Sequence, residues 1–257
     1  MARAIWKGTL ALGKASVPVK MYSAVQDRNI HFRLLHASDL VPVHQRIVRK
    51  SDGKEVPKED RRKAFPVGED TAVILQPEEL ERIEPETSRE IDFCRFVGAG
   101  TLSDQWFDRP YYLGPDEDDV AYFALAEALV REEAIGIARW VMRRKRYVGA
   151  LTATGGYLVL TTLRRADQVL SVQVDARGNA PDEKELKLAQ ALVDYVAADF
   201  DPAQWQDEYR ERVMKLIEAK RRGEKVKVKA PRRKRSEGGL ADQLRQSLAS
   251  MSERKVA

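Results

Sequence analysis

The sequence predicts an α+β fold in which a β-rich body is followed by amphipathic helices and a basic tail. Three observations lead to this prediction. Residues 138–163 are rich in Val, Leu, Thr, Trp and Tyr and read as three strands, the last two joined by Gly155-Gly156. Residues 182–222 contain two helical patterns with their apolar positions on one face. From residue 220 to 235 there are ten Lys or Arg and one Glu, a composition typical of a disordered basic arm.

The length and the charge pattern limit the class of protein. With 257 residues, 43% of them hydrophobic, the chain can form one large domain or one domain with appendages. Net charge changes sign in blocks, being +8 for residues 1–66, −13 for 67–138, +7 for 139–165, −6 for 166–219 and +9 for 220–257. One block alone is often a solvated face, but three basic blocks separated by two acidic ones favour a positive surface that binds a polyanion.

The cysteine content and the absence of long apolar runs indicate the compartment. The single cysteine, Cys94, excludes intrachain disulfides and a cysteine-based zinc site, and we expect it to be an inert thiol packed with Phe93 and Phe96. The N-terminus has no charged-then-apolar leader, and no run of about eighteen apolar residues occurs. We therefore expect a soluble cytoplasmic protein that is not associated with a membrane.

Residues 5–22 predict two short strands around a Gly13-Lys14 turn. The same residues come close to a phosphate-binding loop, because Gly8 precedes Gly13 and Lys14 with the required spacing. However, Ala15 stands where such a loop needs a magnesium-binding hydroxyl. A proline three residues later also interrupts the helix whose N-terminus would have to bind the phosphates. The sequence therefore argues against an ATPase.

Residues 29–66 have a different texture, with short apolar groups among polar and basic residues and a Ser51-Asp52-Gly53 turn. Too few bulky apolar residues are present to bury this segment, so we predict an extended ribbon that projects from the body; the alternative is an ordinary exposed hairpin. His31 and His36 have half of a zinc-site spacing, but no further Cys or His pair completes four ligands. We expect no metal and no other cofactor.

The middle of the chain predicts further strands and one long helix. Residues 71–75 read as a buried strand, a proline opens a short helix over residues 76–79, and residues 89–97 read as another strand. Residues 107–113 then lead through a Gly114-Pro115 turn into a helix from about 119 to 133. Its expected apolar stripe consists of Val120, Phe123, Leu125, Ala128 and Leu129.

The corner between the first two strands of the central meander is Arg143-Arg144-Lys145-Arg146. Residues 139–165 contain seven basic side chains and no acidic one, so one edge of this sheet carries uncompensated positive charge. Such an edge is suited to a polyanion.

Two amphipathic helices follow the β body. Pro181-Asp182 opens the first, Asp201-Pro202 caps the second, and Gly223 ends it. Their apolar faces need a cover, which is either the chain's own body or that of a partner. Beyond the basic arm, an apolar stripe at Leu240, Leu244 and Leu248 predicts either a docking peptide that folds on its partner or a frayed terminal helix.

The sequence favours a binding protein over an enzyme. It contains no Gly-x-Ser-x-Gly, no His-Glu-x-x-His and no complete set of metal ligands. The four carboxylates at 116–119 resemble a magnesium site, but a run of this kind before a helix is more often exposed N-terminal charge. The absence of these motifs does not exclude catalysis. The enzyme class stays open only for a nucleotide-dependent activity that requires Lys14.

Five fragments in order resemble the bacterial Ku proteins of non-homologous end joining: ARAIWKGTLALG…VPVKMYSA, IHFRLLHASD, FDRPYYLGP, IGIARWVMRRKRYVGALTATGGYLVLTTLRRADQV and DFDPAQWQDEYRERVMKLIEAKRRG. The resemblance implies a Ku-type β-barrel core over residues 1–170, with an extended DNA-encircling bridge at about 30–65. It further implies a helical dimerisation arm over 171–222 and a basic tail with a short amphipathic peptide over 223–257.

The same resemblance implies a homodimeric ring that is threaded by linear double-stranded DNA ends, protects them and is associated with the bacterial nucleoid. It also implies that the ring recruits a multi-domain ATP-dependent DNA ligase for double-strand break repair. The expected DNA-binding residues are Arg33, Arg46, Arg49, Lys50, Lys54, Arg61, Arg62, Lys63, Arg143, Arg144, Lys145 and Arg146. The expected dimerisation residues are Leu192, Val196, Trp205, Tyr209, Val213 and Leu216, and those for ligase docking are Leu240, Leu244 and Leu248. The competing class is a basic nucleic-acid-binding protein that encircles nothing.

Overall fold

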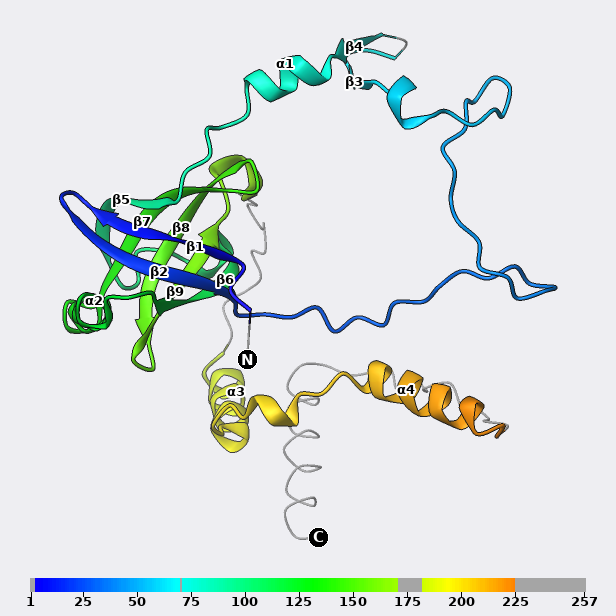
Figure 1. Ribbon diagram of the computed structural model, residues 1–257. Coiled ribbons are helices and arrows are strands. Elements are labelled where there is room, and N and C mark those ends of the chain that lie inside the picture. Colours follow the sequence, from blue (N-terminus) through cyan, green and yellow to red (C-terminus); the bar gives the residue numbers. More distant parts are fainter. Residues whose placement is uncertain (1–2, 70, 171–181, 225–257) are drawn as a thin grey trace. The chain divides into compact units, whose positions relative to one another are not determined.

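Seven strands close into a β-barrel in the computed structural model (Figure 1), which describes residues 3–69, 71–170 and 182–224. The strands are β1 (Trp6–Leu12), β2 (Ala15–Ser23), β5 (Glu90–Gly98), β6 (Phe107–Pro115), β7 (Ala134–Met142), β8 (Lys145–Thr154) and β9 (Tyr157–Leu163). Their order around the barrel is β1-β2-β6-β9-β8-β7-β5, and neighbours are antiparallel except β1 and β5, whose parallel pairing closes the barrel. The predicted α+β class, the first hairpin and the meander of β7, β8 and β9 are confirmed.

Alternate residues of the strands fill the barrel, as the two-residue period of a strand requires. In β2, Val17, Val19 and Met21 are buried, while the residues between them keep some exposure. Trp140 of β7 is also buried, and its ring lies over Gly149 of β8. A Cβ at that glycine would come within 2.6 Å of the ring, so any larger residue would displace the tryptophan.

The helix α2 (Asp119–Arg131) packs against β2, β7, β8 and β9. Its buried Tyr122 hydroxyl donates to the carbonyl of Leu113 and accepts the backbone N–H of Leu158 at 2.8 Å, and burial raises the pKa of this phenol. The predicted helix is confirmed, and its predicted stripe is confirmed only at Leu125 and Leu129, which pack on the core. The predicted stripe residues Val120, Phe123 and Ala128 are exposed, and Tyr122 and Ala126 are buried instead. The tyrosine face is buried because its hydroxyl pairs with a backbone carbonyl of β6 and a backbone N–H of β9, so no polar group of this side chain is left unpaired.

The chain leaves the barrel after β2 and returns at β5, and we call residues 24–89 the excursion (Figure 1). It contains a 3-10 turn (Lys58–Asp60), β3 (Lys63–Pro66), β4 (Ala72–Leu75) and α1 (Pro77–Arg82), with β3 and β4 paired only to each other. Two isolated β-bridges, Leu35 with Pro42 and Val48 with Glu55, link its arms locally. None of its described residues is buried, in agreement with the predicted extended ribbon.

Three local expectations about the β body are wrong. Residues 71–75 form a strand but not a buried one, since Val73 and Ile74 of β4 are more than half exposed in a two-stranded sheet with no covering layer. Gly114-Pro115 is not a turn, because β6 runs through it. Cys94 is exposed and not packed, since the β5–β7 register shifts between Phe93 and Arg95 and turns the intervening side chain outward.

The chain divides into two units, residues 1–172 and 173–257, and the described part of the second consists of helices. The helix α3 (Glu183–Val196) begins at Asp182, whose carboxylate accepts the backbone N–H of Glu185 at 2.7 Å. The second predicted helix does not start at Asp201-Pro202: those residues begin a 3-10 turn (Pro202–Gln204), and α4 (Glu208–Arg221) follows with its own cap. Among the described residues no helix is both long and apolar enough to cross a membrane.

Candidate nucleic-acid interface

The turn between β7 and β8 holds two arginines in a conformation that arginine rarely adopts. Arg143 has φ +51° and Arg144 has φ +61°, and the flanking Met142 pairs with Lys145, so the loop has two residues. The left-handed region costs a residue with a side chain about 1–2 kcal/mol, and two-residue loops of this kind normally contain Asn-Gly. Arginine at both positions therefore indicates that the side chains, and not the turn, are what this corner requires.

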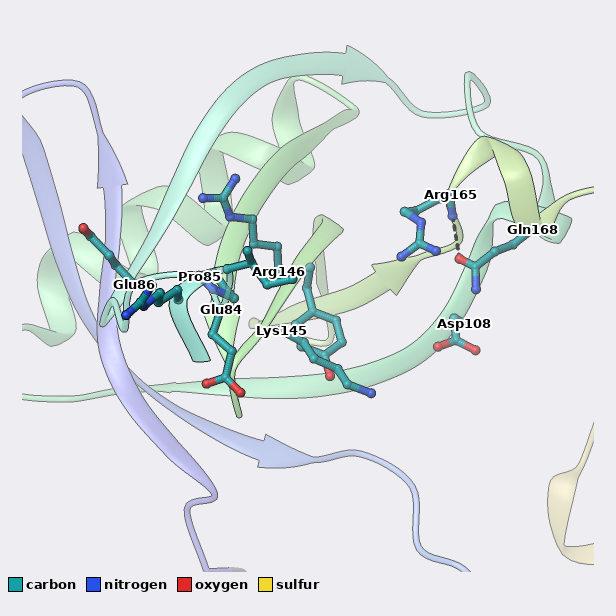
Figure 2. A pocket seen from close by; sticks show the side chains of 11 residues that line it. Glu84, Pro85, Glu86, Asp108, Lys145, Arg146, Arg165 and Gln168 are labelled. Carbon is teal, nitrogen blue, oxygen red and sulfur yellow. Dashed lines mark hydrogen bonds between the residues drawn. The ribbon is translucent and has the colours of Figure 1, made fainter. Parts of the chain in front are cut away.

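A cavity of about 960 Å³ opens beside this hairpin (Figure 2). Its cations come from three elements, with Arg82 at the end of α1, Lys145 and Arg146 on β8, and Arg165 just after β9. Three carboxylates share the lining, namely Glu84, Glu86 and Asp108. Figure 2 shows Lys145 and Arg146 reaching the cavity from one strand and Arg165 from a separate segment.

Sequence reasoning did not select Arg82 or Arg165 for this site. A signal for Arg165 was present, since it belongs to the acid-free stretch of residues 139–165. No signal existed for Arg82, because its neighbours in sequence are acidic and only the fold carries it to the basic corner.

The predicted cations differ in the partners they already hold. Arg46 pairs with Glu55 at 2.9 Å and Arg49 with Asp52 at 3.6 Å, while the Arg61 guanidinium donates to a backbone carbonyl. Arg62 likewise donates to carbonyls, and Arg144 pairs with Glu84. Within the described chain, the predicted cations with no carboxylate in salt-bridge distance and no such carbonyl contact are Arg33, Lys50, Lys54, Lys63, Arg143, Lys145 and Arg146.

The fold brings part of this set together and leaves part of it apart. Arg61 and Lys63 from the excursion and Arg144 from the β7–β8 turn line one hollow of about 240 Å³. The predicted residues nearer the start of the excursion do not line it; they are Arg33, Arg46, Arg49, Lys50 and Lys54. The hollow also contains Glu81 and Glu84, so cations and carboxylates meet at this point.

The other candidate sites in the sequence do not form. Gly8 lies within β1 and Gly13-Lys14 is a hairpin turn followed by β2, so no helix N-terminus is present to bind a phosphate.

The acidic run at 116–119 forms contacts with neighbouring residues of the fold. Asp116 accepts from Lys20 at 2.5 Å and from Lys7 at 3.2 Å, and Asp118 caps α2. The hydrogen bond from Lys20 lowers the pKa of Asp116, and the same bond raises the pKa of Lys20. Among the described residues no group of His, Cys, Asp and Glu could hold a metal ion.

The predicted dimerisation residues lie on the helical unit. Trp205 is 75% exposed and Tyr209 is 63% exposed, whereas Leu192, Val213 and Leu216 are partly buried. Val196 is the last residue of α3. Sequence reasoning left Val193 and Phe200 out of this set, although both are exposed apolar residues of the same unit. The Phe200 ring stacks on the Trp205 ring, with 6.3 Å between the ring centroids.

The predicted ligase-docking residues Leu240, Leu244 and Leu248 lie outside the described residues, as does most of the basic tail.

Comparison with known proteins identifies one family over most of the barrel. Residues 11–188 match the model of the Ku70/Ku80 beta-barrel domain. The chain is 40% identical over 229 residues to non-homologous end joining protein Ku 2 of Geotalea uraniireducens, an alignment that covers 89% of this chain and 90% of that protein. It is 33% identical over 257 residues to the Ku protein of Koribacter versatilis, with 99% and 89% coverage, and 39% identical over 230 residues to that of Leifsonia xyli, with 88% and 78% coverage.

Proposed function

This chain belongs to the Ku family of bacterial non-homologous end joining proteins, and we propose that it binds the ends of double-stranded DNA as a homodimeric ring. The observation that carries the proposal is the excursion, whose described residues are all at least partly exposed and whose residues 30–65 contain nine Lys or Arg against five Asp or Glu. A segment of this kind has no core of its own to fill. Family membership also agrees with the expectation that the chain is not an enzyme.

The mechanism follows from which part of DNA a cationic ring can reach. Lysine and arginine contact phosphates, and phosphate contacts carry no sequence information. Grip on the duplex is therefore independent of sequence. A closed ring can be entered only where a duplex ends, so its topology turns non-specific affinity into selectivity for ends without any reading of bases.

The proposed lining combines the excursion with the basic corner of the barrel. It consists of Arg33, Arg46, Arg49, Lys50, Lys54, Arg61, Arg62, Lys63, Arg143, Arg144, Lys145 and Arg146. The ion pairs that three of these arginines hold are exposed, and exposed pairs contribute only about 0–1 kcal/mol, so phosphate can displace them. If six phosphates are neutralised, the logarithm of the affinity falls with the logarithm of salt concentration at a slope of roughly −5.

We propose that the helical unit closes the ring by packing against a second copy. Val193, Phe200, Trp205 and Tyr209 are large apolar side chains that are mostly exposed on this unit, and clustered exposed apolar residues mark interaction surfaces. Burial against an identical partner would form an interface of the obligate, hydrophobic kind. In this division residues 1–170 are the core with its bridge, 171–222 the dimerisation arm, and 223–257 a tail that recruits a multi-domain ATP-dependent DNA ligase.

The proposal is tested by competition between two forms of one DNA. The protein is bound to a labelled linear duplex and challenged with unlabelled DNA of the same sequence, either linear or covalently closed. A ring predicts that the linear competitor displaces the label and the closed form does not. Equal competition would favour the alternative, a basic nucleic-acid-binding protein that uses the same cations without encircling the duplex.

A further inference from the structure

Among the residues that the structure describes, one ion pair joins the returning limb of the excursion to the basic corner of the barrel. The Glu84 carboxylate lies 3.3 Å from the Arg144 guanidinium, across 60 positions of sequence. The Arg144 side chain is 67% exposed, whereas that of Glu84 is only 35% exposed. The carboxylate is therefore partly covered by its surroundings, whereas most of the arginine side chain is in contact with solvent.

Glu84 also occupies a position that a phosphate would favour. It lines both the hollow that contains Arg61, Lys63 and Arg144 and the larger cavity with Lys145 and Arg146 (Figure 2). Carboxylate and phosphate oxygens accept the same charge-assisted hydrogen bonds from a guanidinium. DNA backbone that approaches these cations must therefore compete with Glu84 for Arg144.

We propose that Glu84 is an internal substitute for phosphate, which holds Arg144 in the free protein and is exchanged for a DNA phosphate on binding. This inference rests on the proposed function and adds to it a residue that regulates the grip. No covalent step is involved: Arg144 changes its acceptor from Glu84 to phosphate, and Glu84 moves into water.

The exchange releases a short piece of backbone. Residues 83–89 connect α1 to β5 and contain no helix or strand. Their far end is fixed, because the Arg89 carbonyl accepts the backbone N–H of Thr9 at 2.9 Å. Loss of the Glu84 contact therefore frees residues 83–88 while the barrel stays closed, and the root of the excursion gains freedom when DNA is bound.

Two substitutions in the full chain test the exchange through the salt dependence of DNA binding. With Glu84→Gln, exchange predicts tighter binding to a linear duplex by about twofold to fivefold per protomer, the range expected for loss of one competing exposed ion pair. The slope against salt stays unchanged, because Arg144 already reaches phosphate in the unsubstituted protein. With Arg144→Ala, binding weakens and the slope becomes shallower by about 0.9 per protomer.

The opposite result identifies a permanent mask. If Glu84 keeps Arg144 in the DNA complex, Glu84→Gln steepens the slope by about 0.9 per protomer, since a new cation reaches the backbone, and Arg144→Ala leaves the slope unchanged. Either observation overturns the inference, as does a Glu84→Gln variant that binds no more tightly. The matched control is Glu127→Gln, which breaks an exposed 2.8 Å pair with Arg131 on α2 and should change neither quantity.

Amide hydrogen exchange gives an independent readout. The Glu84 amide, which donates to the Glu81 carbonyl at 3.3 Å, should exchange faster in the unsubstituted protein when DNA is bound, whereas in Glu84→Gln it should exchange fast without DNA. Slower exchange on DNA binding would contradict release of the limb. These outcomes are separate from failure of the proposed function, which would appear as equal displacement of the unsubstituted protein by linear and by covalently closed competitor DNA.

Discussion

Replacement of the β7–β8 turn separates the fold of the basic corner from its function. The double variant Arg143→Asn with Arg144→Gly puts residues that favour the left-handed conformation at the two positions with φ +51° and +61°. The substitutions relieve strain of about 1–2 kcal/mol at each position. Against this, glycine adds freedom to the unfolded chain, which costs about 0.5–1 kcal/mol, and Asn keeps a smaller strain. The expected net stabilisation is about 1–2 kcal/mol. For a domain of this size the midpoint of thermal unfolding should rise by about 2–8 °C.

DNA binding should move in the opposite direction. Two phosphate contacts are lost in each protomer, so affinity for a linear duplex falls and the salt slope becomes shallower by about 1.8 per protomer. The assays are differential scanning calorimetry of the free protein and fluorescence anisotropy titrations at several salt concentrations. The matched control removes two exposed charges elsewhere, with Arg95→Gln and Arg131→Gln, and should change neither the slope nor the stability by a comparable amount.

Two results would refute this reasoning separately. A double variant that is no more stable, or less stable, would show that the left-handed arginines carry no strain. A variant that binds DNA with undiminished affinity and slope would remove the basic corner from the lining. An increase in stability with a loss of binding is the combination that supports a turn kept for its side chains.

Three further predictions concern other parts of the chain. Trp205→Asp with Leu216→Asp should shift the sedimentation of the purified protein from dimer to monomer, and a dimer that persists would place the interface elsewhere. Asp116→Asn should lower the midpoint of unfolding at pH 7. The Lys20 hydrogen bond lowers the pKa of Asp116, so the ion pair stabilises the fold above the unfolded pKa, about 3.9, and this stabilisation is lost as pH falls through the still lower folded pKa. The difference in unfolding midpoint between Asp116→Asn and the unsubstituted protein should therefore narrow in acid. A difference that stays constant with pH would contradict the prediction. Leu244→Asp should abolish stimulation of the ligase while leaving DNA affinity unchanged, and undiminished stimulation would remove this stripe from ligase docking.

Local sequence signals predicted the barrel well where turn chemistry and strand period agree. The glycines at Gly13 and at Gly155-Gly156 have positive φ and join strands as expected. The signals failed where a choice depends on distant partners. Periodicity could not show that α2 buries Tyr122, because that preference comes from backbone groups at Leu113 and Leu158 on other elements.

The sequence predicted which segments are rich in basic residues, but it did not predict how those residues are arranged or which partners they hold. The count of basic residues identified the excursion and the meander corner, but it could not distinguish Lys63, which has no carboxylate partner within the described chain, from Arg46, which pairs with Glu55. Nor could it place the acidic Glu84 against Arg144, since the two are 60 positions apart. Exposure of β4 was hidden for a related reason: an apolar run indicates a strand, and only the fold decides whether another layer covers it.

The proposed function requires a duplex to pass through a closed ring of protein, and a trapping experiment tests this directly. The protein is loaded on a linear duplex with biotin at both ends, streptavidin is added to block the ends, and the complex is challenged with high salt and excess competitor. We predict that the protein stays on the blocked DNA and leaves promptly when a restriction enzyme opens an end. Equal dissociation from blocked and open DNA would contradict encirclement and leave a protein that only lies against the duplex.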